Sequence, residues 1–168
     1  MEVGDYLTLV GELAIGVAGF SGVVAALTRR SADAWRPIDV LRFQMLIRQS
    51  VTAAMFAVLP ALLLTSGVPD TVTWRIVAGA WLASIPLLVF RLTLSARNQV
   101  SANPEDTSRA LYAVVGAAPV ASAALELVNL VALAAPWPHL VVLAISLFVA
   151  VSLFVRLATV AFSPEPPA

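Results

Sequence analysis

The chain has 168 residues, of which 60% are hydrophobic and 12% charged, and its mean hydropathy is +0.92. A water-soluble domain of this size needs more polar surface, so the composition predicts an integral membrane protein. Ten arginines balance ten acidic residues and lysine is absent, so no excess of positive charge favours nucleic acid as a partner. With no cysteine and a single histidine, His139, we expect no disulfide, metal centre or cofactor site built from such ligands.

Five stretches of the chain have the length and apolar character of helices that cross a ~30 Å hydrocarbon layer. They cover residues 6–27, 37–66, 74–96, 110–133 and 139–162, and the second begins early because Pro37 suits the first turn of a helix. We therefore predict an all-α integral membrane protein, with residues 1–168 forming one multi-pass domain of about five transmembrane helices. The expected location is the cell membrane, with the lipid bilayer as its surroundings.

The arginines set the expected orientation, because cytoplasmic loops are enriched in them. Four follow the first helix and two flank the loop after the third, whereas the opposite side has only Arg75; the six are Arg29, Arg30, Arg36, Arg42, Arg97 and Arg109. The N-terminus is therefore expected outside and the C-terminus in the cytoplasm. Trp74, Trp81 and Trp137 fall near the outer ends of their helices, where we expect them to anchor the protein at the interface.

The first helix has an unusual number of small residues. Ala14, Ala18, Gly22 and Ala26 follow one another at four-residue steps, and Gly19 widens this row. Small residues let helix backbones approach closely in a membrane, so we expect this helix to be central. It packs either on the chain's own other helices or on copies of itself around an axis. Leucine at Gly22 should disrupt this packing, whereas an equally bulky residue at Leu143, predicted to face lipid, should not.

Residues 19–27, GFSGVVAAL, resemble the GxSG motif of rhomboid intramembrane proteases, in which the serine is the nucleophile of a Ser-His dyad. The resemblance covers about nine residues, and it implies that Ser21 would need His139 as its partner. The predicted threading places Ser21 ~22 Å along its helix from the outer side and His139 at the outer mouth. A hydrogen bond of about 3 Å does not bridge that separation, so we interpret Ser21 as a packing residue.

Two glutamates lie within predicted membrane helices, at similar depths. Glu12 is in the first helix, and Glu126 belongs to a polar stripe of the fourth helix with Pro119, Ser122 and Asn129. Such a stripe must face protein or water instead of lipid. Each glutamate is either a protonated structural acid, with Glu126 bonded to Asn129 or Ser122, or part of an aqueous path that attracts cations or relays protons.

These features leave three classes of function open. The leading hypothesis is a homo-oligomeric, cation-conducting pore with the glycine-rich first helix near its axis, where Glu12 forms a carboxylate ring and a monovalent or divalent cation is the partner. Phe20 would form a constriction, Arg29 and Arg30 the cytoplasmic mouth, and Glu126, Asn129 and Ser122 would support the path. The alternative is a non-catalytic scaffold or accessory subunit of a larger complex. An intramembrane enzyme is the third, for which we find no convincing catalytic residues.

Overall fold

The computed structural model describes residues 2–28, 37–102 and 109–161, and the side chains of all of these except 27–28, 87–102, 109–112 and 160–161. The described chain is almost entirely helical and contains no strand, which confirms the all-α prediction. Its elements are α1 (Val3–Thr28), α2 (Pro37–Thr65), α3 (Asp70–Ala102), α4 (Arg109–Val128), the π-helix η1 (Asn129–Leu133) and α5 (Pro136–Ala161).

Four helical stretches of the described chain are long and apolar enough to span a membrane: Val3–Ala26, Pro37–Thr65, Ala113–Leu133 and Pro136–Thr159. They correspond to the first, second, fourth and fifth predicted helices. The third predicted helix lies inside α3, whose second half has side chains outside the described set. The structure thus supports a multi-pass membrane protein with at least these four candidate spans.

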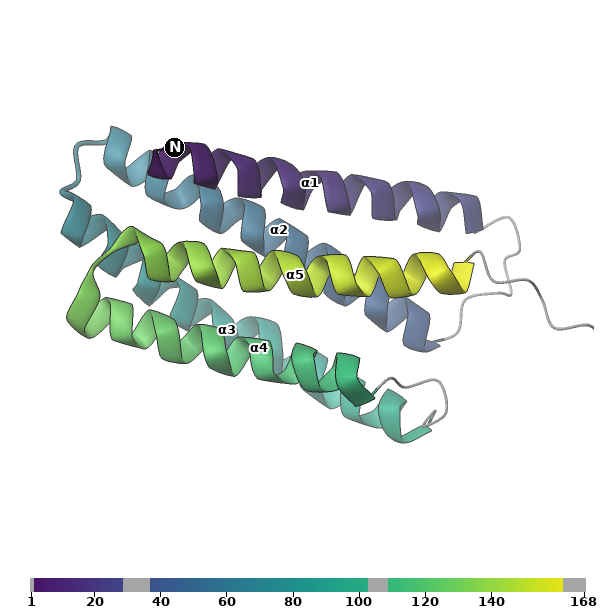
Figure 1. Ribbon diagram of the computed structural model, residues 1–168. Helices are drawn as coiled ribbons and strands as arrows, with labels where there is room; N and C mark the ends of the chain where they lie inside the picture. The colour runs from purple at the N-terminus through teal and green to yellow at the C-terminus, as the bar shows by residue number, and fades with distance from the viewer. Residues whose placement is uncertain (1, 29–36, 103–108, 162–168) are drawn as a thin grey trace, which may run out of the picture.

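The helices run side by side and alternate in direction (Figure 1). Two short turns, residues 66–69 and 134–135, lie at one end of the bundle, together with the start of α1; we refer to this end as the turn end. At the first turn, Gly67 has φ +80°, and the N–H groups of Gly67 and Val68 donate to the carbonyls of Leu64 and Leu63. This pattern closes the end of α2 with the left-handed residue that favours glycine.

The central helix is α5, which contacts α1, α2, α3 and α4. The expectation that the first helix would be central within the chain is wrong, since α1 packs mainly on α2 and α5 at one side of the bundle. Small residues allow close approach without specifying which partner approaches. The central helix is instead the one with neighbours on all sides, which is α5. Of the four candidate spans, α5 is both the most apolar and the most buried.

A core cluster fills the half of the bundle near the turn end. Its buried members are Leu7, Ala57, Trp74, Trp81, Val142 and Leu143. Trp74 and Trp81 are therefore core residues, which corrects their assignment as interface anchors, whereas Trp137 is exposed. Leu143 is fully buried, so its assignment to the lipid-facing surface is also wrong. The reason is that α5 is apolar all the way round, so that its sequence pattern does not distinguish the inner from the outer face.

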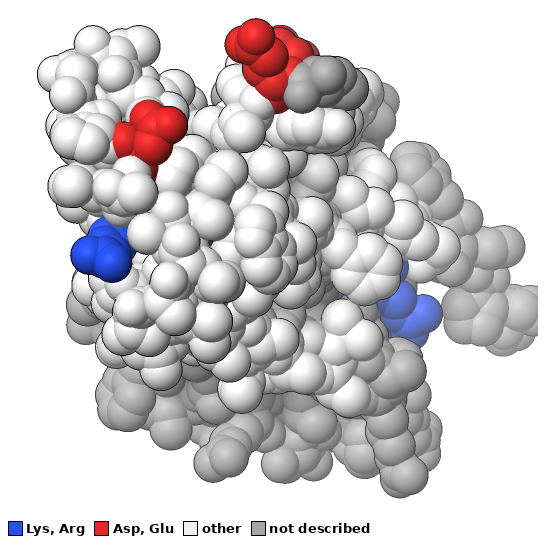
Figure 2. All heavy atoms as spheres, turned by 60° about the vertical axis from the view of Figure 1, so that its left-hand side comes forward, with Lys and Arg blue, Asp and Glu red and all other residues white. Residues whose placement is uncertain are grey.

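The outer surface is mostly apolar. Large side chains such as Ile15, Met55 and Phe148 are exposed, and the face in Figure 2 has only a few charged groups, separated by wide uncharged areas. An apolar surface of this extent is typical of contact with lipid or with other membrane helices.

Candidate functional site

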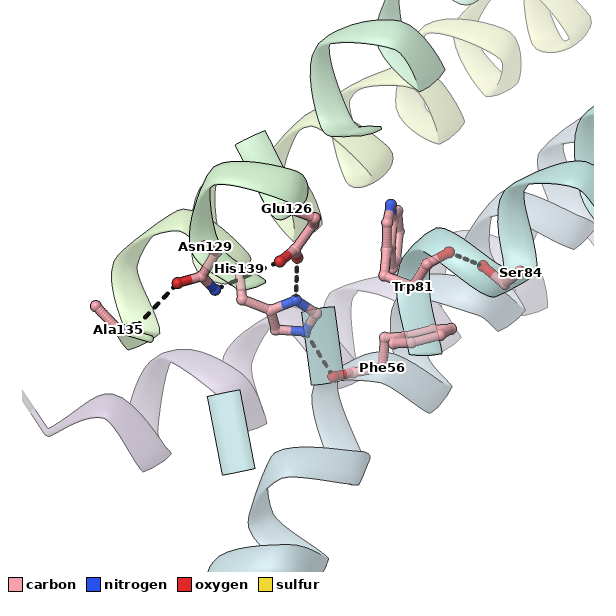
Figure 3. Close-up of polar contacts among 7 residues, drawn as sticks. All are labelled: Phe56, Trp81, Ser84, Glu126, Asn129, Ala135 and His139. Carbon is pink, nitrogen blue, oxygen red and sulfur yellow. Dashed lines mark hydrogen bonds and ion pairs between the residues drawn. The ribbon is translucent and has the colours of Figure 1, made fainter. Parts of the chain in front are cut away.

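A buried acid and a buried base meet between α4 and α5. Glu126, near the end of α4, and His139, in the first turn of α5, both have no exposed side-chain area. Glu126 Oε1 lies 2.5 Å from His139 Nδ1, so a hydrogen bond joins the carboxyl group to the imidazole (Figure 3). The two residues are 13 positions apart, and the turn between α4 and α5 brings them together.

The other ring nitrogen of His139 reaches a third helix. His139 Nε2 lies 3.0 Å from the backbone oxygen of Phe56 in α2. In a regular helix this oxygen would accept a hydrogen bond from the N–H of the residue four positions later, but that residue is Pro60, which has no N–H. The proline thus leaves a carbonyl within the helix free to accept, and His139 uses it.

Asn129 connects this pair to the turn. Its Nδ2 donates to Glu126 Oε2 at 3.4 Å, and its Oδ1 accepts from the N–H of Ala135 at 2.9 Å. Its backbone oxygen accepts from the N–H of Ala134, which has the left-handed conformation with φ 49°. Asn129 is the first residue of η1, so this single residue closes the π-helix through its backbone oxygen and Oδ1, and it supports the carboxyl group of Glu126 through Nδ2.

Three aromatic rings surround the imidazole of His139. The ring centroids of Phe56, Trp74 and Trp81 lie 6.2, 6.3 and 6.1 Å from that of His139, and Phe56 and Trp81 pack edge to face at 4.8 Å. Figure 3 shows Trp81 and Phe56 beside the imidazole. These rings exclude water from the acid–base pair. Hydrogen bonds and ion pairs are stronger in such a dry environment, and an uncompensated charge is more costly.

The polar stripe predicted on the fourth helix lies inside the bundle. Ser122, Glu126 and Asn129 are buried, and the predicted contact between Glu126 and Asn129 is confirmed. His139 is the functional candidate that sequence reasoning missed, because it was assigned to the outer mouth. The available signals were a lone histidine near the start of one apolar helix, a glutamate near the end of the preceding one, and a proline four residues after Phe56.

The candidates in α1 fall on two different sides of that helix. Ala14 is fully buried and Ala18 half-buried, whereas Gly19, Gly22 and Ala26 are exposed. Each four-residue step advances about 40° around a helix of 3.6 residues per turn, so the row rotates away from the bundle. A Cβ placed on Gly16, Gly19 or Gly22 would meet no atom of the described chain within 4 Å, and of the glycines in α1 only Gly11 lies close to a neighbouring helix, at Ala57.

Glu12 and Phe20 are also on the exposed side of α1, and Phe20 is 69% exposed. Glu12 makes no hydrogen bond or ion pair within the part of the chain that the structure describes. Since Glu126 is fully buried and bonded to His139 and Asn129, the two glutamates are not brought to one surface of the chain. Arg29 and Arg30 lie outside the described residues.

Ser21 and His139 do not form a dyad. The Ser21 hydroxyl is buried and donates to the backbone oxygen of Val17 at 2.6 Å, and both ring nitrogens of His139 are already bonded elsewhere. Within the described chain, therefore, the resemblance of residues 19–27 to a rhomboid motif is not accompanied by the hydrogen bond that this chemistry requires.

The fold and the site define an all-helical bundle with candidate membrane spans and a dry acid–base pair in its core. No metal-binding group of three or more histidine, cysteine or acidic residues occurs in the described part of the chain. Comparisons with protein families, with curated proteins and with solved structures give no match.

Proposed function

We propose that this chain is a multi-pass cell-membrane protein that assembles with copies of itself into a cation-conducting pore, lined by the exposed side of α1. The observation that carries the proposal is the position of Glu12. This residue is nine positions after the start of α1, or about 14 Å along the helix, on a side that its own chain leaves uncovered. A carboxyl group facing hydrocarbon is costly, so Glu12 requires water, a cation or another protein.

The residues around Glu12 favour another helix over lipid as the neighbour. Thr8, Gly16 and Gly19 are on the same side of α1 as Glu12, at steps of four, four and seven residues. Small residues there would let α1 helices from several copies approach closely. A ring of copies would put every Glu12 at one level around the axis, which is the arrangement that attracts cations in acidic selectivity rings.

The proposed orientation follows from the arginines. All five helices would span the membrane, with the N-terminus and the turn end outside and the C-terminus in the cytoplasm. Glu12 would then be in the outer half of the pore and Phe20 at a constriction further in, with Arg29 and Arg30 at the cytoplasmic mouth. The protein would be non-enzymatic, without cofactor or metal centre.

The same exposed side of α1 supports a second candidate, a scaffold or accessory subunit that binds an unrelated membrane protein. Such a partner would have to present a cationic or hydrogen-bonding group opposite Glu12, because a buried carboxylate must be paired. A self-assembled ring has no such group opposite Glu12 and would use water and cations instead. The two candidates therefore differ in the mass of the purified protein and in what neutralises Glu12.

The test combines mass and flux. The mass of the protein in nanodiscs should be a multiple of 17.7 kDa, and liposomes containing it should pass monovalent cations. Glu12→Gln should assemble normally but lower cation flux or selectivity about tenfold, the cost of losing ~1.4 kcal/mol of cation stabilisation. The matched control is Glu2→Gln, which removes an exposed carboxyl group that precedes α1.

A strict monomer would contradict the pore and favour the scaffold. Unchanged flux in Glu12→Gln, or no flux from an intact oligomer at any pH tested, would contradict the role of Glu12 as the group that attracts the cation.

A further inference from the structure

His139 bonds two different helices through its two ring nitrogens. A backbone carbonyl only accepts hydrogen bonds, so the contact with Phe56 requires a hydrogen on Nε2. The contact between Nδ1 and Glu126 Oε1 then requires a second hydrogen, located either on the carboxyl group or on Nδ1. In the first case both residues are neutral, and in the second they form an ion pair. The pair has no net charge in either case.

We propose that Glu126 and His139 form a proton-binding site, in which one shared proton is the ligand that connects α2, α4 and α5. A neutral imidazole has one N–H hydrogen, and without the shared proton His139 has no second hydrogen to place. If the remaining hydrogen stays on Nε2, a bare Nδ1 faces a carboxylate. If it moves to Nδ1, a bare Nε2 faces the Phe56 carbonyl.

Loss of the shared proton therefore breaks one of the two contacts, to α4 or to α2. Addition of a further proton gives Glu126 an O–H and Nδ1 an N–H, so Nδ1 can still donate to Oε1 only if the added hydrogen is on Oε2. That state also has a net positive charge in a dry core, which is costly. Both contacts exist together without a net charge only when the pair shares one proton.

Among the side chains that the structure describes, no other group next to the pair could take over this proton. From α2 the neighbour is Phe56, from α3 they are Trp74 and Trp81, and from α4 the neighbour is Asn129, none of which titrates in the ordinary range. Of the described charged residues on the contacting helices, Asp70 and Arg75 of α3, Arg48 of α2 and Glu12 of α1 are exposed. Asp39 and Arg42 of α2 are buried and form an ion pair with each other, but they precede Phe56 by 17 and 14 positions, or about 26 and 21 Å along the helix. Arg156 of α5 is half-buried, but it follows His139 by 17 positions, or about 26 Å along the helix.

The site acts on a part of the bundle where a proline lies inside a helix. Pro60 interrupts the hydrogen bonds of α2, and the freed carbonyl of Phe56 is bonded to α5 only through the imidazole. Breaking that contact would leave only apolar packing, such as that of Ala57 with Val142 and Leu143, to hold this end of α2 against α5. The proton thus acts as a latch on this half of the bundle, which is independent of whether α1 lines a pore.

The presence of one histidine makes the proton directly observable. In nanodiscs, the nitrogen-15 NMR spectrum of the wild-type protein should contain one imidazole, with a hydrogen on Nε2 and a strongly deshielded, slowly exchanging proton between Nδ1 and Glu126. Glu126→Gln should abolish the deshielded proton and keep the Nε2 hydrogen, because an amide N–H can donate to a bare Nδ1. The control Glu12→Gln should leave both signals unchanged. A wild-type spectrum without the shared proton, or with a bare Nε2, would overturn the proposal.

The latch itself is tested by the distance between α2 and α5. Spin labels are attached to cysteines at the exposed positions Leu62 and Val141, and pH is raised until the shared-proton signal is lost. The wild-type distance should increase or broaden over the same pH interval. Glu126→Gln keeps both contacts of His139 without a mobile proton, so its distance should not respond to pH. An unchanged wild-type distance after loss of the signal, or an equal response in Glu126→Gln, would overturn the latch.

Discussion

The Phe56 carbonyl is available to His139 because Pro60 has no N–H to donate to it. Pro60 is buried and lies within α2, where a proline ordinarily destabilises a helix by about 3 kcal/mol. The hydrogen bond from His139 satisfies the acceptor that the proline exposes, which in a membrane interior would otherwise cost several kcal/mol. One residue that weakens its own helix thus creates the contact that joins this helix to α5.

Pro60→Ala should weaken the bond between His139 and Phe56. The new N–H at position 60 would compete for the same carbonyl, so the Nε2 hydrogen signal of His139 should move toward that of a weaker hydrogen bond. Pro86→Ala is the matched control, because Pro86 is also inside a helix but is exposed on α3. If the His139 signal is the same in the Pro60→Ala protein as in the wild type, the proline does not create this acceptor.

Asn129→Ala should destabilise the protein by about 1–3 kcal/mol, because the Ala135 N–H loses its acceptor and Glu126 loses a donor. The measurement is the unfolding midpoint in detergent titrated with a denaturing surfactant. Ser152→Ala, which removes an exposed hydroxyl that bonds within its own helix, should shift the stability by no more than about 0.5 kcal/mol. Equal midpoints for the two variants would show that the amide does not support the turn.

At the scale of the helices, the glycines of α1 divide between two environments. Gly11 lies against α2, where a Cβ would be 3.8 Å from the Cβ of Ala57, whereas Gly22 is exposed and a Cβ there meets nothing within 4 Å. At Gly11 a Cβ would be at ordinary van der Waals distance from α2, so only a larger side chain would crowd the neighbouring helix. Gly22 is unexplained by the chain alone and is accounted for by the proposed contact between copies.

Leucine substitutions separate these two environments. Gly11→Leu should destabilise the single chain by about 1–3 kcal/mol, because its extra carbons overlap α2. Gly22→Leu should leave the stability of the monomer unchanged or raised by up to about 1 kcal/mol, since it removes a flexible residue from a helix, while it abolishes self-assembly. Unfolding measurements and the mass in nanodiscs check the two effects. An oligomer that survives Gly22→Leu would contradict the contact through this side of α1.

The sequence predicts the helices well and their packing poorly, for a physical reason. Pro37 and the apolar lengths define α1, α2 and α5 to within about three residues, because the hydrocarbon thickness constrains them strongly, whereas α3 begins four residues before and ends six residues after the predicted helix. The inward faces of α3 and α5 are not predictable in the same way, since Trp81 and Leu143 belong to stretches that are apolar on every side. Polar residues are the exception. The burial of the stripe with Glu126 is predictable from the sequence, because exposing these polar side chains to lipid is costly. Its partner His139 depends on the turn geometry, which the pattern does not encode.

For the whole molecule, the structure makes the turn end a single surface, with the start of α1 and both short turns at one end of the bundle (Figure 1). The positive-inside rule further predicts that this end is outside the cell.

Since the chain has no cysteine, single thiols report accessibility without background. Ser66→Cys and Trp137→Cys, both at exposed positions of the turn end, should react with a membrane-impermeant reagent added to intact cells, as should Gly4→Cys near the start of α1. If all three thiols react only after the cells are opened, the turn end is cytoplasmic, which contradicts the predicted orientation and is consistent with the bundle. If Ser66→Cys and Trp137→Cys react from opposite sides, the helices cannot cross the membrane as a bundle of alternating direction, because two turns at the same end of such a bundle must face the same side of the bilayer.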